Sequence, residues 1–112
     1  MTRAVLFEDA AGRITGVSVK GHSGYAEEGS DIVCAGISTL LITIDQALCS
    51  LVGLSLIEHG GEDGFAEVLL PPGISGKQME QAQLLFGALR IGFSAIAEQY
   101  PAYFRLTTRK VH

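Results

Sequence analysis

Cys34 and His22 are the two residues of this 112-residue chain whose types and spacing could carry out nucleophilic chemistry. Asp31 is a good helix N-cap, and a helix that begins there places Cys34 in its first turn. Unpaired backbone N–H groups and the helix dipole favour a thiolate at that position. His22 lies in a glycine-rich loop that can fold back over the helix start, where its imidazole could accept the thiol proton and later donate it to a leaving amine. The arrangement predicts acyl transfer by a cysteine nucleophile.

Each of these residues also has an ordinary structural explanation. A free cysteine most often serves as a small buried hydrophobic residue, and a single loop histidine often has no role. Asp31 either caps the helix, which is the favoured interpretation, or orients His22. Ser38 lies one helical turn after Cys34, so it either lines the same site or packs inside the protein.

Other site chemistries find weaker support in the sequence. The chain contains no C-x-x-C and no H-E-x-x-H motif, so neither a metal site nor a cofactor is expected. Cys49 would lie roughly 22 Å from Cys34 along one helix, too far for a disulfide or for a redox role shared by the two thiols. The glycine-rich loop lacks the Walker spacing and its lysine, and Glu27 and Glu28 would repel a phosphate. His59 and His112 are interpreted as surface residues.

The elements that must position Cys34 and His22 follow from the apolar periodicity. We expect strands over residues 3–7 and 14–20, a helix from Ser30 or Asp31 to about Ile57, a strand over 65–70, a helix over 75–99 and a strand over 103–111. The first two strands should form a hairpin. The order β-β-α-β-α-β favours an α+β two-layer sandwich, with both helices packed on one face of a mainly antiparallel sheet. In the second helix, one buried face is expected, formed by Ala82, Phe86, Leu89, Phe93 and Ile96.

Composition and charge narrow the functional class. A chain of 112 residues, 47% hydrophobic and 18% charged, indicates a single globular domain over residues 1–112. Its net charge of −4 gives no basic footprint, so direct nucleic-acid binding is not expected. The N-terminus does not resemble a secretory signal. The apolar stretch over 32–57 contains Asp45 and is interpreted as a core helix, not a membrane span. Free thiols are typical of a reducing cytoplasm.

The two segments that carry the candidate site resemble a known family. Gly21-His22-Ser23-Gly24-Tyr25-Ala26, followed by Gly29-Ser30-Asp31-Ile32-Val33-Cys34-Ala35-Gly36-Ile37-Ser38, closely resembles the ribosomal-processing cysteine protease family, called Prp or YsxB-like. The resemblance covers essentially the whole chain, and the joint pattern is long enough to be specific. It implies that Cys34 and His22 are catalytic and that Gly21, Asp31 and Ser38 occupy supporting positions. Ser23 and Gly36 stand where alanine is more usual.

The resemblance also implies a substrate and an assembly. Members of the family remove a short N-terminal extension from the twenty-seventh protein of the large ribosomal subunit. They cut after aromatic residues, and they form homodimers. The loop that contains Ser23, Gly24, Tyr25 and Gly29 is expected to be mobile and to order around the substrate. We expect the amide of Cys34 and a neighbouring loop amide to form the oxyanion hole. The alternative is a non-catalytic module of ribosome assembly that binds the same protein without cutting it.

Overall fold

The computed structural model describes residues 1–22, 24–27, 31–61 and 64–111. Its strands and helices, in chain order, are β1 (Thr2–Glu8), β2 (Ile14–Lys20), α1 (Ile32–Ser50), β3 (Ile57–Gly60), β4 (Phe65–Leu69), α2 (Gly76–Gln99) and β5 (Phe104–Lys110). The observed order is therefore β-β-α-β-β-α-β. The expected order lacked β3, and the first helix is shorter than the sequence predicted.

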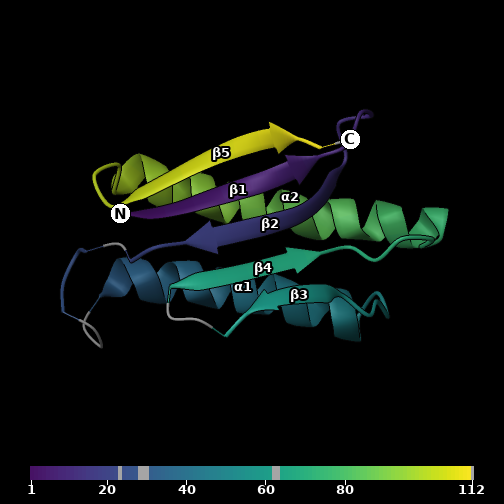
Figure 1. The fold of residues 1–112 in the computed structure, drawn as a ribbon, viewed down its shortest axis with the longest axis horizontal. Coiled ribbons are helices and arrows are strands. Elements are labelled where there is room, and N and C mark those ends of the chain that lie inside the picture. The colour runs from purple at the N-terminus through teal and green to yellow at the C-terminus, as the bar shows by residue number, and fades with distance from the viewer. Residues whose placement is uncertain (23, 28–30, 62–63, 112) are drawn as a thin grey trace.

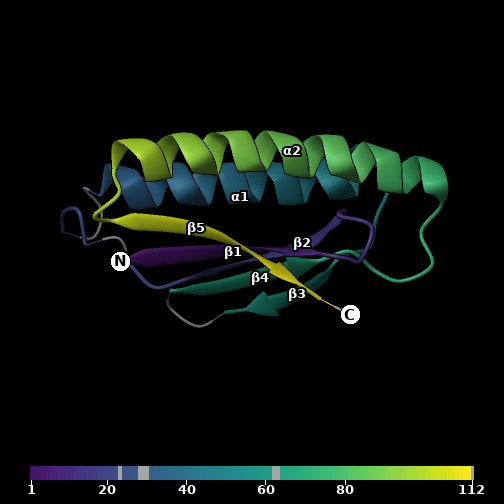
Figure 2. The ribbon, with the colours of Figure 1, turned by 90° about the horizontal axis from the view of Figure 1, so that it is seen from above.

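The strands form one mixed sheet in the order β3-β4-β2-β1-β5. The β1–β2, β2–β4 and β3–β4 pairs are antiparallel, whereas β1 and β5 are parallel. Figure 1 shows this sheet in front of the two helices, and Figure 2 shows that both helices cover the same face. The expected α+β two-layer sandwich and its mainly antiparallel sheet are confirmed.

The first helix ends at Ser50 because the chain adopts a left-handed turn at Gly53, where φ is +78°. The amide of Val52 donates to the carbonyl of Ala47 (3.4 Å), and the amide of Leu54 donates to the carbonyl of Leu48 (3.1 Å). Such bonds satisfy the last carbonyls of a helix, and glycine is the residue that takes the left-handed position most readily. The expectation that the helix continues to Ile57 is therefore wrong, and the apolar residues after Gly53 lead into β3 instead.

The core lies between the sheet and the helix layer. The buried side of α1 repeats every three or four residues, and that of α2 does the same. On α2, four of the five residues expected to form one buried face are buried, and Ile96 is partly buried against them. The buried side chains of the two helices and of the sheet beneath them include Val33, Ile37, Leu41, Ile44, Leu48, Ala82, Phe86, Leu89, Phe93, Ala4, Leu6, Val17 and Val68.

Within the described part of the chain, α1 is the one helix long and apolar enough to cross a membrane. A single helix of this kind is weak evidence for a membrane span, because core helices pass the same test. Here α1 lies beside α2 on the sheet and contributes five side chains to the core (Figure 2). We therefore interpret it as a core helix.

The two helices approach closely at Gly92. A Cβ atom placed there would lie 2.8 Å from Cδ1 of Leu40 on α1, whereas a Cβ atom at Gly87 would meet nothing within 4 Å. Replacing a glycine inside a helix by alanine ordinarily stabilises a protein by about 0.5–1 kcal/mol.

We expect Gly87→Ala to raise the free energy of unfolding by about that amount. Gly92→Ala should be less stable than Gly87→Ala by roughly 1 kcal/mol, because Leu40 must move to accommodate the methyl group. Urea denaturation of the two variants beside the wild type measures the difference. Equal gains at both positions would contradict the close contact between α1 and α2.

Candidate active site

Cys34 is the third residue of α1 and is half-buried. The helix is capped by Asp31, whose Oδ1 atom accepts hydrogen bonds from the backbone amides of Val33 and Cys34, both at 3.0 Å. The first intrahelical bond runs from the amide of Ala35 to the carbonyl of Asp31 (3.0 Å). The expected cap is therefore present, and it places the thiol in the positively polarised first turn.

The cap alters one expectation about the site. The amide of Cys34 was expected to stabilise an oxyanion, but it already donates to the Asp31 carboxylate. An N–H group that is committed to a carboxylate is not available to a developing oxyanion unless that bond is released. In this conformation the Cys34 amide is therefore part of the cap.

His22 follows β2 and is positioned by two glycines. Gly21 adopts φ +95°, and its amide donates to the carbonyl of Gly64 at 2.7 Å. A Cβ atom at Gly21 would lie 2.6 Å from the carbonyl oxygen of Met1, so both the backbone conformation and the space require glycine. Gly21 therefore fixes the path of the backbone that leads to His22.

Gly64 itself lies beneath the His22 ring. A Cβ atom at Gly64, where φ is +77°, would be 3.0 Å from Nε2 of His22. Gly64 therefore allows the imidazole to rest against the turn that leads into β4. The sequence alone gives no sign of this contact, since nothing local indicates that Gly64 lies against a histidine 42 residues away.

Cys34 and His22 come from different layers but lie at one end of the molecule. The C-terminal end of β2, which leads to His22, and the N-terminal end of α1, which holds Cys34, both lie at the left in Figure 1. The side chain of His22 is exposed, so it is accessible to a substrate. Ser38 is also exposed, which excludes packing in the core and leaves the interpretation that it lines the surface beside Cys34.

Tyr25 attaches the loop after His22 to the segment that joins α2 to β5. Its ring makes edge-to-face contacts with Tyr100, at 5.5 Å between centroids, and with Tyr103, at 5.2 Å. Such aromatic pairs contribute about 0.5–1.5 kcal/mol each beyond the area they bury. Gly24, with φ +72°, is exposed beside it. Ser23 and Gly29, which were also assigned to a mobile substrate loop, lie outside the described residues.

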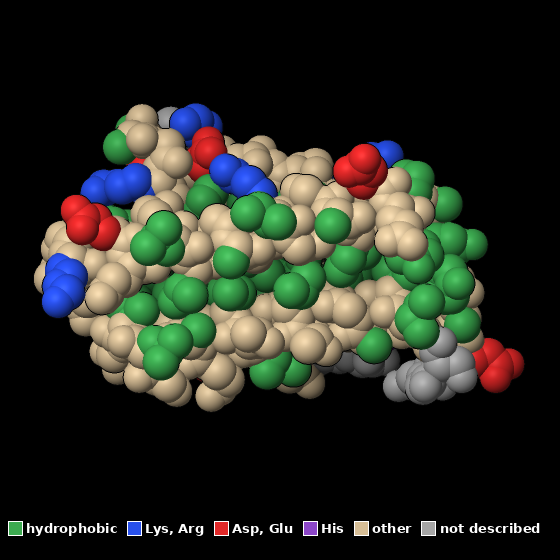
Figure 3. All heavy atoms as spheres, turned by 180° about the vertical axis from the view of Figure 1, so that it is seen from behind, with side chains coloured by type: hydrophobic (Ala, Val, Ile, Leu, Met, Phe, Trp, Pro, Cys, Tyr) green, Lys and Arg blue, Asp and Glu red, His purple; other side chains and the backbone are tan. Residues whose placement is uncertain are grey.

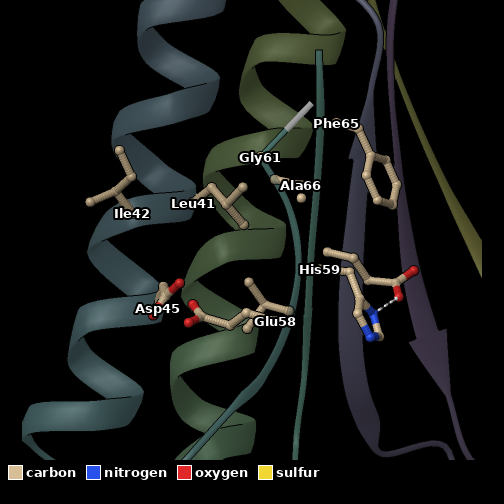
Figure 4. Close-up of a pocket in the computed structure, with 11 residues that line it drawn as sticks. Leu41, Ile42, Asp45, Glu58, His59, Gly61, Phe65 and Ala66 are labelled. Atoms are coloured by element: carbon tan, nitrogen blue, oxygen red, sulfur yellow. Dashed lines mark hydrogen bonds and ion pairs between the residues drawn. The ribbon is translucent and has the colours of Figure 1, made fainter. Parts of the chain in front are cut away.

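A pocket of about 420 Å³ lies further along the same side of α1. It is lined by Leu41, Ile42 and Asp45 of α1 and by residues 58–61 and 65–68 of the β3–β4 hairpin (Figure 4). Asp45 follows Cys34 by three helical turns, about 16 Å along the axis, and points in nearly the same direction. The pocket is therefore near the candidate nucleophile without containing it.

Two carboxyl groups meet in this pocket. Figure 4 shows Glu58 and Asp45 facing each other, with His59 on the other side of β3, where its Nδ1 atom lies 2.9 Å from Oε1 of Glu67. A hydrogen bond to Asp45, partial burial and the negative charge of Asp45 raise the pKa of Glu58 above its usual 4.5. Burial, followed by the charges of Asp45 and Glu58, raises the pKa of Cys49. Cys49 is therefore in a poor environment for a thiolate.

The carboxyl pair makes stability depend on pH. The folded protein holds the Glu58 proton more tightly than the unfolded chain does. The contribution of protonated Glu58 to stability is therefore fully present below pH 4.5 and is lost as the pH rises through the folded-state pKa. We expect Glu58→Gln to remove this dependence and to raise Tm at pH 8 by about 1–3 °C, since exposed like-charge contacts cost a few tenths of a kcal/mol.

Thermal unfolding followed by circular dichroism between pH 4 and pH 8 tests this prediction. Glu80→Gln, which removes the same charge from the exposed surface of α2, controls for net charge. If the control variant flattens the pH profile as much as Glu58→Gln does, the pair is not its source.

Sequence comparison assigns the chain to one family. The family model described as cysteine protease Prp matches residues 1–105. The ribosomal processing cysteine protease Prp of Bacillus subtilis (strain 168) is 28% identical over 96 residues, which cover 85% of this chain and 86% of the relative. The protein of the same name from Staphylococcus aureus (strain Mu50) is 28% identical over 99 residues, covering 85% of this chain and 87% of the relative.

Solved structures share the fold over nearly the whole chain. SMU.848 from Streptococcus mutans superposes with a TM-score of 0.80 and 32% identity, covering 99% of this chain and 96% of that one. The essential ribosomal processing protease Prp from S. aureus, in complex with a covalently linked product peptide, superposes with a TM-score of 0.87. At 24% identity, with 97% of this chain and 100% of that chain covered, the second likeness establishes the common architecture.

Proposed function

Because the chain belongs to the cysteine protease Prp family, and is therefore a peptide hydrolase of ribosomal processing, we propose a specific substrate and mechanism for it. The substrate is the twenty-seventh protein of the large ribosomal subunit, from which the enzyme removes an N-terminal extension after an aromatic residue. Cys34 is the nucleophile and His22 its acid–base partner. The observation that carries this proposal is the Asp31 cap, which holds Cys34 in the first turn of α1 at the end of the molecule where His22 emerges.

The proposed mechanism is acyl transfer in two stages. The Cys34 thiolate attacks the scissile carbonyl, and a carbon–sulfur bond forms. His22 then donates a proton to the departing amine as the carbon–nitrogen bond breaks, which leaves a thioester. In the second stage His22 accepts a proton from water, the resulting hydroxide attacks the thioester, and the Cys34 thiolate is released with the new carboxylate.

The surface beside Cys34 supports a peptide that lies along α1. Asp45 and the 420 Å³ pocket are about 16 Å from Cys34, a distance that roughly five residues of an extended peptide span. Leu41, Ile42 and Ala66 give the pocket apolar walls suited to hydrophobic side chains of the extension. We propose that the extension occupies this path.

The outer surface of the helix layer supports the proposed homodimer. Figure 3 shows hydrophobic side chains distributed along this face. Large hydrophobic side chains of α2 that are mostly exposed include Leu84 (77%) and Ile91 (74%). Exposed apolar surface of this kind is typical of protein interfaces, and we propose that a second copy of the chain covers it. The two free cysteines support a cytoplasmic location.

Incubation of the purified protein with the ribosomal protein, extension included, tests the assignment. We expect the wild type to release one N-terminal fragment and Cys34→Ala to cut more than about 1,000-fold more slowly, because the nucleophile is missing. Cys49→Ala is the matched control and should cut at the wild-type rate. Mass spectrometry identifies the products, and circular dichroism checks that each variant is folded.

Two outcomes would contradict the proposal. Wild-type cleavage rates from Cys34→Ala would show that another residue is the nucleophile. Binding of the ribosomal protein without truncation by the wild type would favour the non-catalytic assembly module instead.

A further inference from the structure

One face of the sheet is not covered by the helices. Figure 2 shows α1 and α2 together on the opposite face, which leaves the outer face of β5, β1, β2 and β4 open. The side chains on this outer face alternate with the buried ones of each strand. They include Arg3, Val5 and Phe7 of β1, Ser18 and Lys20 of β2, Phe65, Glu67 and Leu69 of β4, and Arg105, Thr107 and Arg109 of β5.

Positive charge is concentrated on this outer face. The strand register places Lys20 opposite Arg3 on one side and Arg105 beside Arg3 on the other, which makes a row of three cations across β2, β1 and β5. Arg109 lies on the same face, beside Phe7, with its guanidinium carbon 5.9 Å from the ring centroid. Four of the eight Lys and Arg residues of a chain with net charge −4 therefore share one surface.

A hollow of about 340 Å³ lies among these cations. It is lined by the small side chains of Val5 and Ser18 and by the three cations Arg3, Lys20 and Arg109. Gly21, which precedes His22, also lines the hollow. The basic face therefore reaches the end of the molecule that carries the candidate active site.

The row of cations destabilises the sheet when no anion lies beside it. Like charges directly opposite each other on neighbouring strands destabilise a sheet. Within the described ranges no ion pair joins Arg3, Lys20, Arg105 or Arg109 to an acid. The neighbouring acids are otherwise engaged, since Glu67 pairs with His59 at 2.9 Å, and Glu8 pairs with Arg90 at 3.5 Å and with Lys110 at 3.3 Å. Positive charge that is left uncompensated in this way indicates an anionic partner.

We propose that this outer sheet face binds the phosphate backbone of single-stranded RNA. Guanidinium groups match the planar, bidentate geometry of phosphate. Phe7 and Phe65 lie on the same face, and aromatic rings on an open sheet provide stacking surfaces for bases. An acidic peptide would use the cations but not the rings. The inference goes beyond the proposed function, and it revises the expectation from net charge, because a total of −4 conceals a local cluster of opposite sign.

Fluorescence anisotropy with a labelled single-stranded RNA of about 12 nucleotides tests the proposal. We expect the wild type to bind it in low salt and Arg3→Gln/Arg105→Gln/Arg109→Gln to bind at least about tenfold more weakly. The slope of log K against log salt should become shallower by about 2, since each lost phosphate contact on a single strand contributes about 0.7. Arg13→Gln/Lys77→Gln/Arg90→Gln removes the same charge from the hairpin turn and α2, and it should bind as the wild type does.

Three results would overturn the inference. These are equal affinity of the wild type and the first triple variant, an equal loss of affinity in both triple variants, and tighter binding of an oligoglutamate peptide than of RNA to the same face. Peptide cleavage, measured separately with free substrate, should be unchanged in the Arg3, Arg105 and Arg109 variant. Any of these three results with cleavage retained would therefore reject this inference and leave the proposed protease function standing.

Discussion

The hydrogen bonds from the first-turn amides of α1 to Asp31 are the contact on which the rest of the site depends. They fix where the helix begins, and the helix start determines both the position of Cys34 and the direction of every later residue on α1. A cap of this kind contributes about 1 kcal/mol to stability. Its larger consequence is positional, because moving the helix start by one residue would turn the thiol by about 100° around the axis.

The sheet supplies the second half of the site through backbone contacts that only glycine permits. The bond from Gly21 to Gly64 joins the end of β2 to the start of β4, and the His22 ring rests on Gly64. The proposed nucleophile, Cys34, therefore belongs to the helix layer, and His22 follows a strand of the sheet layer. Both elements reach the same end of the molecule. The two outer surfaces differ in chemistry, with an apolar helix face and a basic sheet face. This division would leave the sheet face open to another partner if copies of the chain associate through their helices.

Local signals were sufficient for the elements that local interactions determine. The hairpin, the Asp31 cap and the buried face of α2 follow from short-range periodicity and capping, and they are present. The helix stop at Gly53 was missed because the residues on both sides of it are apolar. The strand β3 was missed because a four-residue edge strand is defined by its pairing with β4. The contacts of Gly64 with His22 and of Tyr25 with two distant tyrosines could not be predicted, because they join residues far apart in the chain. The basic face was missed for the same reason, since strand register, not composition, brings its cations together.

We propose that the capped first turn of α1 makes Cys34, and not Cys49, the reactive thiol. The most direct test is alkylation by iodoacetamide at pH 7, followed residue by residue with peptide mass spectrometry. We predict that Cys34 reacts at least about tenfold faster, because burial and the charges of Asp45 and Glu58 raise the pKa of Cys49, whereas Cys34 lies in the positively polarised first turn of α1. Asp31→Ala should change the rate for Cys34, because it removes the cap that positions the thiol, and leave that of Cys49 unchanged. Equal reactivity of the two thiols, or faster alkylation of Cys49, would contradict the account.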